Sequence, residues 1–170
     1  MENIILSPNA KIHPDVELIC SESGQIIIDD FCHIKKGVVI NSYGGIVHIK
    51  SKSTIGEYSV LYGHGGIEIG EATAVAPHCT ISAQQHIESN QIPLRFTGEV
   101  TNGIIIEAGC LIGSHCFVGD NITIGKMTII GANSTVIRSI PSEVLAVGTP
   151  CEVVRKICSN KLYGLKNADA

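Results

Sequence analysis

His86 is the residue of this sequence whose setting best suits catalysis. It lies near the start of a segment, from about residue 82 to 103, that interrupts an otherwise regular aliphatic pattern. Excursions of that length within a compact repeat are uncommon and are usually functional. An imidazole has a pKa near neutrality, so it can take a proton from a reacting hydroxyl as a general base. His86 is therefore a candidate for a catalytic base.

Two charged residues of the same segment are candidates for assisting this imidazole. Glu88 follows His86 by two positions and could orient the ring as a triad carboxylate does, although a backbone carbonyl would serve equally well. Arg95 is a candidate either for ordering the segment or for contacting a substrate. The sequence leaves these alternatives open.

The rest of the chain is organised by a six-residue repeat. An Ile, Leu or Val recurs every sixth position in six groups of three, and Gly follows four of the six such residues from Ile106 onward. A repeat of this kind predicts strands that stack as a solenoid, because each coil buries its inward side chains against the coils above and below. The groups are Leu6/Ile12/Leu18, Ile28/Ile34/Ile40, Ile49/Ile55/Leu61, Ile69/Val75/Ile81, Ile106/Ile112/Val118 and Ile124/Ile130/Val136.

The intervals between groups predict coils with three sides. From the last member of one group to the first of the next, the steps are 10, 9, 8, 25 and 6 residues. Extra residues thus enter only after every third hexapeptide, so insertions leave the stack at a single corner. The 25-residue step, from Ile81 to Ile106, contains His86. We expect residues 1–140 to form an all-β parallel β-helix of about six coils, with an extruded loop at 82–103.

Small residues two places before the aliphatic positions fit the turns of this solenoid. They include Cys32, Cys79, Cys110 and Cys116, which we interpret as half-buried stack residues. The chain has seven Cys and no C-x-x-C pair, so neither a disulfide framework nor a zinc site is indicated.

Two further histidines lie at predicted turns. His64 lies in a Gly-rich turn at the corner of the long loop, one coil earlier, and is either a contact for substrate or His86 or a solvated turn residue. His78 is a second candidate for lining the site. The other histidines are expected to be ordinary turn residues.

After Val136 the period stops, and residues 141–170 are expected to form a capping helix and tail. Thr149-Pro150 is typical of a helix start, and Val153, Val154 and Ile157 would lie on one face of a helix through about Lys161. The tail from Gly164 is expected to fray.

Composition narrows the class of protein. The net charge is −4 without a basic stripe, which argues against nucleic-acid binding. Apolar runs are far too short for a membrane span, and the start of the chain does not resemble a signal peptide. We therefore expect a cytoplasmic protein.

The repeat resembles that of the hexapeptide-repeat acyltransferases, and several motifs are similar to those of the galactoside, maltose and exopolysaccharide O-acetyltransferases. The motifs are residues 61–70 (Leu-Tyr-Gly-His-Gly-Gly-Ile-Glu-Ile-Gly), 75–81 (Val-Ala-Pro-His-Cys-Thr-Ile), His86, 92–95 (Ile-Pro-Leu-Arg), 103–114 (Gly-Ile-Ile-Ile-Glu-Ala-Gly-Cys-Leu-Ile-Gly-Ser), 147–150 (Val-Gly-Thr-Pro) and 153–155 (Val-Val-Arg). There are two departures: Leu111 replaces a usual Trp, and Ile137-Arg138-Ser139 replaces Thr-Lys-Asp.

The resemblance implies a left-handed β-helix, a homotrimer with sites between subunits, and His86 as the catalytic base. It implies acetyl-CoA as co-substrate and no metal. By the same resemblance, the pantetheine arm and the phosphates of the coenzyme would meet Gly113, Ser114, Gly131, Ala132, Arg138 and Arg155, and the acceptor would meet His64, His78, Glu88 and Arg95.

The function expected is O-acetylation of a sugar or glycan precursor, as in polysaccharide biosynthesis. N-acetylation of an amino or nucleotide sugar is an alternative, and a non-catalytic β-helix scaffold is another. γ-Carbonic anhydrases share the fold, but their zinc site needs two His five positions apart, a spacing that this sequence lacks.

Overall fold

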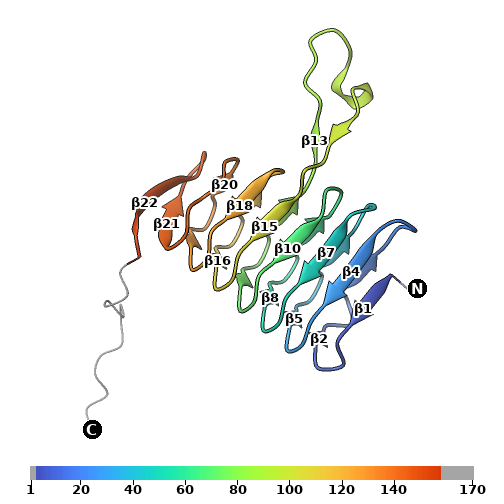
Figure 1. Ribbon diagram of the computed structural model, residues 1–170, viewed down its shortest axis with the longest axis vertical. Coiled ribbons are helices and arrows are strands. Elements are labelled where there is room, and N and C mark those ends of the chain that lie inside the picture. Colours follow the sequence, from blue (N-terminus) through green and yellow to red (C-terminus); the bar gives the residue numbers. More distant parts are fainter. Residues whose placement is uncertain (1–2, 158–170) are drawn as a thin grey trace.

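The computed structural model describes residues 3–157, which wind into a solenoid of stacked three-sided coils (Figure 1). The strands of the solenoid form three sheets, which we call the first, second and third faces. Within the stack, neighbouring coils pair in parallel. This all-β parallel solenoid of about six turns confirms the predicted architecture and is consistent with the left-handed β-helix.

Each coil contributes one short strand to each face. The first face contains β1 (Ile4–Leu6), β4 (Gln25–Ile28), β7 (Ile46–Ile49), β10 (Ile67–Ile69), β15 (Ile104–Ile106) and β18 (Ile122–Ile124). The second contains β2 (Lys11–Ile12), β5 (His33–Ile34), β8 (Thr54–Ile55), β11 (Ala74–Val75), β16 (Leu111–Ile112), β19 (Ile129–Ile130), β21 (Val144–Val147) and β22 (Glu152–Lys156). The third contains β3 (Glu17–Ile19), β6 (Val39–Asn41), β9 (Val60–Tyr62), β12 (Thr80–Ser82), β17 (Phe117–Val118) and β20 (Thr135–Val136).

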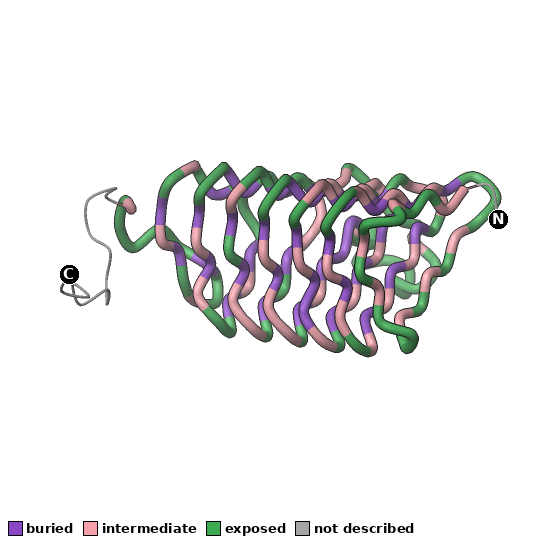
Figure 2. Tube along the Cα trace, turned by 90° about the horizontal axis from the view of Figure 1, so that it is seen from below, coloured by how far each residue is buried: buried purple, intermediate pink, exposed green. Residues whose placement is uncertain are grey.

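The predicted aliphatic positions form the core. From Ile28 to Val136 every one of them is at most 1% exposed, and Figure 2 shows buried positions recurring along the stack. Leu6, in the first coil, is 43% exposed because no described coil covers it. Ile69 pairs directly with Ile106, so the register of the first face runs undisturbed across the 25-residue step.

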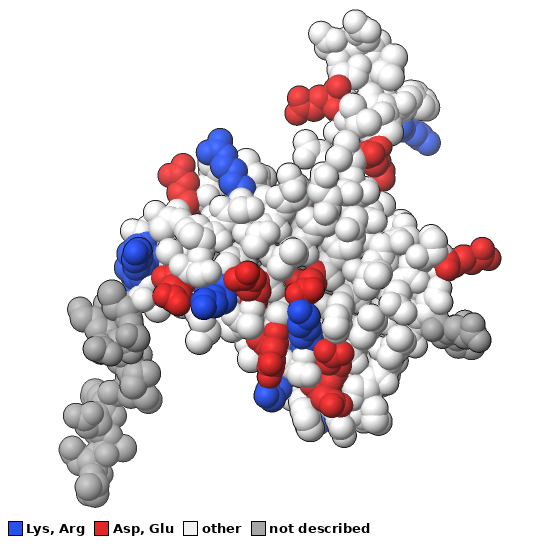
Figure 3. Space-filling model, viewed as in Figure 1, with Lys and Arg blue, Asp and Glu red and all other residues white. Residues whose placement is uncertain are grey.

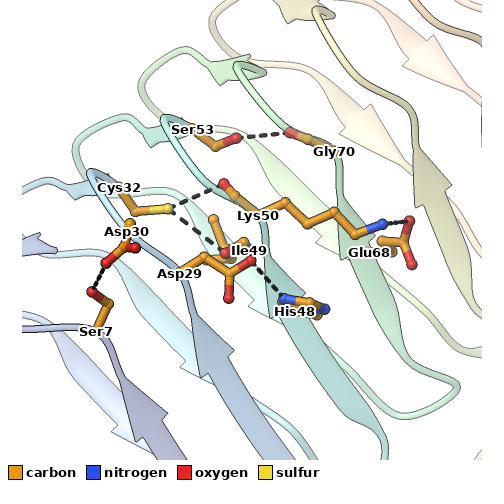
Figure 4. Close-up of polar contacts among 10 residues, drawn as sticks. All are labelled: Ser7, Asp29, Asp30, Cys32, His48, Ile49, Lys50, Ser53, Glu68 and Gly70. Atoms are coloured by element: carbon orange, nitrogen blue, oxygen red, sulfur yellow. Dashed lines mark hydrogen bonds and ion pairs between the residues drawn. The ribbon is translucent and has the colours of Figure 1, made fainter. Parts of the chain in front are cut away.

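Small residues at the turns satisfy backbone groups inside the stack. The Cys32 thiol donates to the Lys50 carbonyl oxygen (3.1 Å), and the Ser53 hydroxyl donates to the Gly70 carbonyl oxygen (2.7 Å; Figure 4). Burial raises the pKa of the Cys32 and Cys110 thiols. These contacts agree with the interpretation of the cysteines as stack residues. The prediction that they are half-buried is wrong, because all four are at most 2% exposed.

The short C-terminal helix predicted from Thr149-Pro150 is wrong where the chain is described. The strand β22 instead folds back antiparallel along β21, with Arg155 opposite Leu145. An outer edge of β21 carries unpaired backbone groups that a strand satisfies directly, and the β-branched Val153 and Val154 favour that conformation. The rest of the predicted helix, through Lys161, and the tail from Gly164 lie outside residues 3–157.

The outer surface carries charges of both signs. On the face drawn in Figure 3, Lys and Arg lie beside Asp and Glu in the left and lower parts of the solenoid. Two such pairs are Lys50 with Glu68 and Lys52 with Glu71. Within residues 3–157 no helix combines the length and the apolar character needed to cross a membrane.

Candidate active site

The segment that carries His86 leaves the solenoid as an arm between the third and first faces (Figure 1). Its base is a two-stranded antiparallel hairpin formed by β13 (Gln85–His86) and β14 (Glu99–Val100), and its loop contains the 3-10 turn η1 (Leu94–Phe96). The Ile87 amide donates to the Gly98 carbonyl oxygen (3.2 Å). We call residues 82–103 the arm, and the corner from which it projects the arm corner.

The predicted base is exposed on this arm, and its register partner is a carboxylate residue. His86 pairs with Glu99 across the hairpin. Glu88 is exposed, and among the hydrogen bonds and ion pairs of the described part of the chain none joins it to His86. Arg95 lies in η1, in the loop of the arm. The structure thus places Glu99, and not Glu88, opposite the catalytic candidate.

The root of the arm is tied to the solenoid by a polar cluster. The amide of Gln84, with its nitrogen in the orientation that the network requires, donates to His64 Nε2 (2.9 Å) and to Glu99 Oε2 (2.9 Å) and Oε1 (3.2 Å). His64 Nε2 also lies 3.9 Å from Glu99 Oε2. The ring of Tyr43 stacks on the His64 imidazole, with centroids 3.9 Å apart and planes 13° apart. We call Tyr43, His64, Gln84 and Glu99 the root cluster.

Burial lowers the pKa of the His64 imidazole and so favours its neutral form. Its side chain is 15% exposed, and desolvation lowers its pKa, an effect that the nearby Glu99 carboxylate opposes. His64 Nδ1 is buried, and no hydrogen-bond partner for it occurs within residues 3–157. His64 is a candidate for contact with the substrate or with His86, and in the structure it lies among residues that hold the arm.

A hollow of about 390 Å³ lies on the third face beside the root cluster. Apolar and polar groups both line it, as is common in pockets that bind small molecules. Its lining is formed by Gln84, Gln85, Phe117, Gly119, Asp120 and Ile137. The predicted phosphate contact Arg138 follows Ile137 at the same corner.

The returning end of the arm is anchored separately. The Asp120 carboxylate accepts hydrogen bonds from the backbone amides of Asn102 (2.9 Å) and Gly103 (2.8 Å) and from the Asn102 side-chain amide (2.9 Å). Both ends of the arm are therefore fixed by side-chain hydrogen bonds.

The predicted pantetheine-lining residues meet at another corner, between the second and third faces. A Cβ on Gly113 would lie 2.5 Å from the Ala132 nitrogen, so the two turns stack closely. The Asn133 amide donates to the Ser114 carbonyl oxygen (2.9 Å), and the Gly131 amide donates to the Ala146 carbonyl oxygen (2.9 Å). We call this the glycine corner.

His78 belongs to the glycine corner and not to the arm. Its ring stacks between Tyr58 (centroids 5.4 Å apart) and His115 (4.9 Å apart). Each of the three residues has a left-handed backbone, with φ between 59° and 61°. The third face therefore separates His78 from His86 within one chain.

The two arginines predicted for the phosphates are not brought together in one chain. Arg138 follows β20 at the arm corner, whereas Arg155 lies in β22, which extends the second face. Leu111, which takes the place of the usual Trp, lies on the outer surface of the second face and is 43% exposed.

Sequence reasoning missed Gln84, Glu99 and Tyr43. Gln84 and Glu99 are separated by 15 positions, and only the pairing of the arm as a hairpin brings them together. Pro93 and Gly98 are turn-forming residues that could have suggested such a hairpin. Within residues 3–157 no group of three or more His, Cys, Asp or Glu is placed to hold a metal ion.

Comparison with known proteins relates this chain to acetyltransferases. It is 34% identical to the galactoside O-acetyltransferase of Escherichia coli over 117 residues, which are 68% of this chain and 57% of that enzyme. The chain spans about half the length of the curated relatives it matches, between 49% and 62% for the first three. No protein-family profile matches it.

Solved structures give the same relation. A maltose O-acetyltransferase from Clostridium difficile superposes with a TM-score of 0.69 at 25% identity, over 81% of this chain and 72% of that one. AntD, an N-acyltransferase from Bacillus cereus solved with dTDP and 3-hydroxybutyryl-CoA, superposes with a TM-score of 0.60 at 25% identity, over 92% of this chain and 81% of that one. The hexapeptide repeat, the three-sided solenoid and these relatives together make the chain a homologue of the hexapeptide-repeat acetyltransferases.

Proposed function

We propose that this protein transfers an acetyl group from acetyl-CoA to a hydroxyl of a sugar or glycan precursor, with His86 as the general base. The observation that carries the proposal is the exposed imidazole of His86 on an arm that leaves the solenoid beside a hollow. The relatives named above support the reaction class, because they are O-acetyltransferases and an N-acyltransferase.

The proposed chemistry needs one proton carrier. The His86 imidazole takes the proton of the acceptor hydroxyl as its oxygen attacks the thioester carbonyl. A tetrahedral oxyanion forms, and its collapse breaks the carbon–sulfur bond. The CoA thiolate leaves and receives the proton from the imidazolium. A backbone N–H at Ser114 or Ala132 would stabilise the oxyanion. The amides of Gly113 and Gly131 already donate to the carbonyl oxygens of Ile130 and Ala146.

We propose that the active site lies between copies of the chain in a homotrimer. In one chain the third face separates the arm from the glycine corner, so His86 and the proposed coenzyme-binding turns do not meet. The arm also exposes large apolar side chains, which a neighbouring copy would bury. They are Ile87, Ile92, Leu94, Phe96 and Val100, and Phe96 is 72% exposed. An active species that sediments only as a monomer would contradict this assembly.

The coenzyme is proposed to run along the glycine corner. Gly113 and Ala132 allow the turns of neighbouring coils to stack closely, and their backbone groups would bond to the peptide-like pantetheine arm. One chain does not bring Arg138 and Arg155 together, so we propose that they meet the phosphates from neighbouring chains of the trimer. Single Arg→Ala variants that each raise the KM for acetyl-CoA would support these two roles.

Release of free thiol from acetyl-CoA, measured with a panel of sugars, amino sugars and nucleotide sugars, tests the reaction. Thiol release that depends on an acceptor and is lost in His86→Ala supports the proposal. Thiol release that is unchanged in this variant contradicts the role of His86. No release with any acceptor, in either form, favours a scaffold.

The same assay separates attack by oxygen from attack by nitrogen. An O-acetyl ester is hydrolysed by mild alkali, whereas an N-acetyl amide survives. A variant of AntD was solved with dTDP-4-amino-4,6-dideoxyglucose and coenzyme A, which makes amino sugars the second acceptor class to test. We place the reaction in the cytoplasm, with an acceptor of the kind used to build polysaccharides.

A further inference from the structure

We propose that Gln84 is a positioning residue, whose side-chain amide locks the root of the arm to His64 and Glu99 and so fixes where the His86 imidazole lies. This inference rests on the proposed role of His86 as the base. It assigns a role to three residues that do not themselves touch the reacting atoms.

Gln84 is the last residue before β13, at the point where the chain enters the arm. It lies two residues before His86, immediately ahead of the strand. Its amide nitrogen reaches both Glu99, the register partner of His86, and His64 on the solenoid. One side chain thus connects the two strands of the arm to each other and to the stack.

The solenoid side of this connection is rigid. His64 is held by the Tyr43 ring, and its turn is bonded to both neighbouring coils. The Gly63 amide donates to the Asn41 carbonyl oxygen (2.8 Å), and the Gly65 amide donates to the Ala83 carbonyl oxygen (2.9 Å). A Cβ on Gly65 would lie 2.6 Å from the Gly103 nitrogen, so the returning end of the arm packs tightly against the same turn. The root therefore has little freedom to shift.

The charges of the cluster fit a neutral His64. The Glu99 carboxylate accepts from the Gln84 amide, and a hydrogen bond to an ionised acceptor is stronger than one between neutral groups. His64 Nε2 accepts from the same amide, which a neutral imidazole can do and an imidazolium cannot. The connection therefore depends on one donor amide between two acceptors.

Exchanging the two polar partners tests this arrangement. Gln84→Glu places two carboxylates together and removes the donor, whereas the double variant Gln84→Glu/Glu99→Gln restores one amide and one carboxylate. A displacement of about 1 Å at a catalytic group can lower turnover by about 100-fold. We expect the single variant to lower kcat by about 10- to 100-fold with the KM for acetyl-CoA within about twofold, and the double variant to regain most of that loss.

A matched control lies in the same arm. Gln91 is exposed in the loop, and Gln91→Ala should leave kcat unchanged, whereas Gln84→Ala should lower it. In a His86→Ala background, Gln84→Glu should cause no further loss, because both substitutions act on one step. A further multiplicative loss in that background would overturn the proposal.

Hydrogen exchange reads the position of the arm independently of turnover. Exchange of the Ile87 amide, which bonds across the hairpin, should be faster in Gln84→Glu and return toward wild type in the double variant. Suppose that His86→Ala is inactive. Equal kcat in Gln84→Glu and wild type, or no recovery of kcat in the double variant, would then overturn the role of Gln84 and leave the proposed function standing. An active His86→Ala would overturn the proposed function, and the exchange data would still report whether the amide connection exists.

Discussion

The solenoid and the arm are held by different kinds of interaction. Each coil is fixed by buried aliphatic side chains and by parallel backbone pairing to its neighbours. The arm has one short hairpin, and its attachment depends on side-chain hydrogen bonds of Gln84 and Asp120. We expect the stability of the stack to tolerate changes in the arm. Catalysis by His86 should not tolerate them, because the arm carries the imidazole outside the core.

The sharpest way to test this separation is His86→Ala. Removing a general base typically lowers turnover by about 10² to 10⁴-fold. The side chain is exposed, so we expect the thermal midpoint to stay unchanged. Steady-state assays and thermal unfolding of the same preparation check both halves. A large fall in the midpoint would show that the arm contributes to the stability of the stack.

The opposite pattern is expected for Ile106→Ala, which changes the first strand after the arm. Ile106 is fully buried between Ile69 and Ile124, and truncation leaves a cavity. We expect a loss of about 2–5 kcal/mol in the free energy of unfolding. Denaturant titration measures it, and the exposed Ile105→Ala is the control. Equal losses in the two variants would contradict the assignment of the core face.

A smaller effect is expected at the glycine corner for Gly113→Ala. The added methyl would lie 2.5 Å from a backbone nitrogen of the next coil, so the two turns must separate. Overpacking of this kind costs about 1–3 kcal/mol, and the KM for acetyl-CoA should rise. For the free energy of unfolding, the control for added bulk at a turn is Gly119→Ala, whose added methyl would lie 3.4 Å from its nearest contact. It does not serve as a control for KM, because Gly119 lines the hollow beside the root cluster. Unchanged affinity in Gly113→Ala would remove this corner from the coenzyme site.

The smallest expected effect is a dependence of stability on pH through His64. Burial lowers the pKa of its imidazole in the folded state, so the unfolded chain binds the proton more readily. This contribution to stability is complete above the ordinary histidine pKa of about 6.5 and is lost as pH falls below it. Thermal midpoints between pH 7.5 and 5.5 should therefore fall more in wild type than in His64→Gln. Parallel curves would contradict the assignment.

The solenoid could be predicted from the sequence because each coil needs a buried aliphatic residue at every sixth position. Eighteen aliphatic positions at fixed spacing leave few alternatives, and the insertions identify the corner. The C-terminal segment has no such repetition. Thr149-Pro150 matched a local signal for a helix. The segment forms β22 instead, because it pairs with the open edge of β21, a contact that local sequence does not reveal.

The sequence predicted only those site residues that are recognisable one at a time. His86 is distinguished by its long segment and by a family resemblance. The root cluster is not, because Tyr43, His64 and Glu99 come from three distant turns and strands whose proximity depends on the path of the arm. Glu88, the carboxylate nearest to His86 in sequence, was the natural candidate, but hairpin pairing brings Glu99 to that place.

The direct pairing of Ile69 with Ile106 has a consequence for protein engineering. The coils on either side of the arm pair as they would across a short turn. We therefore expect the stack to fold with a different segment in place of the arm. Replacing residues 82–103 by a tight connection should leave a folded, inert prism, and grafting a different arm there could give the same prism a new acceptor.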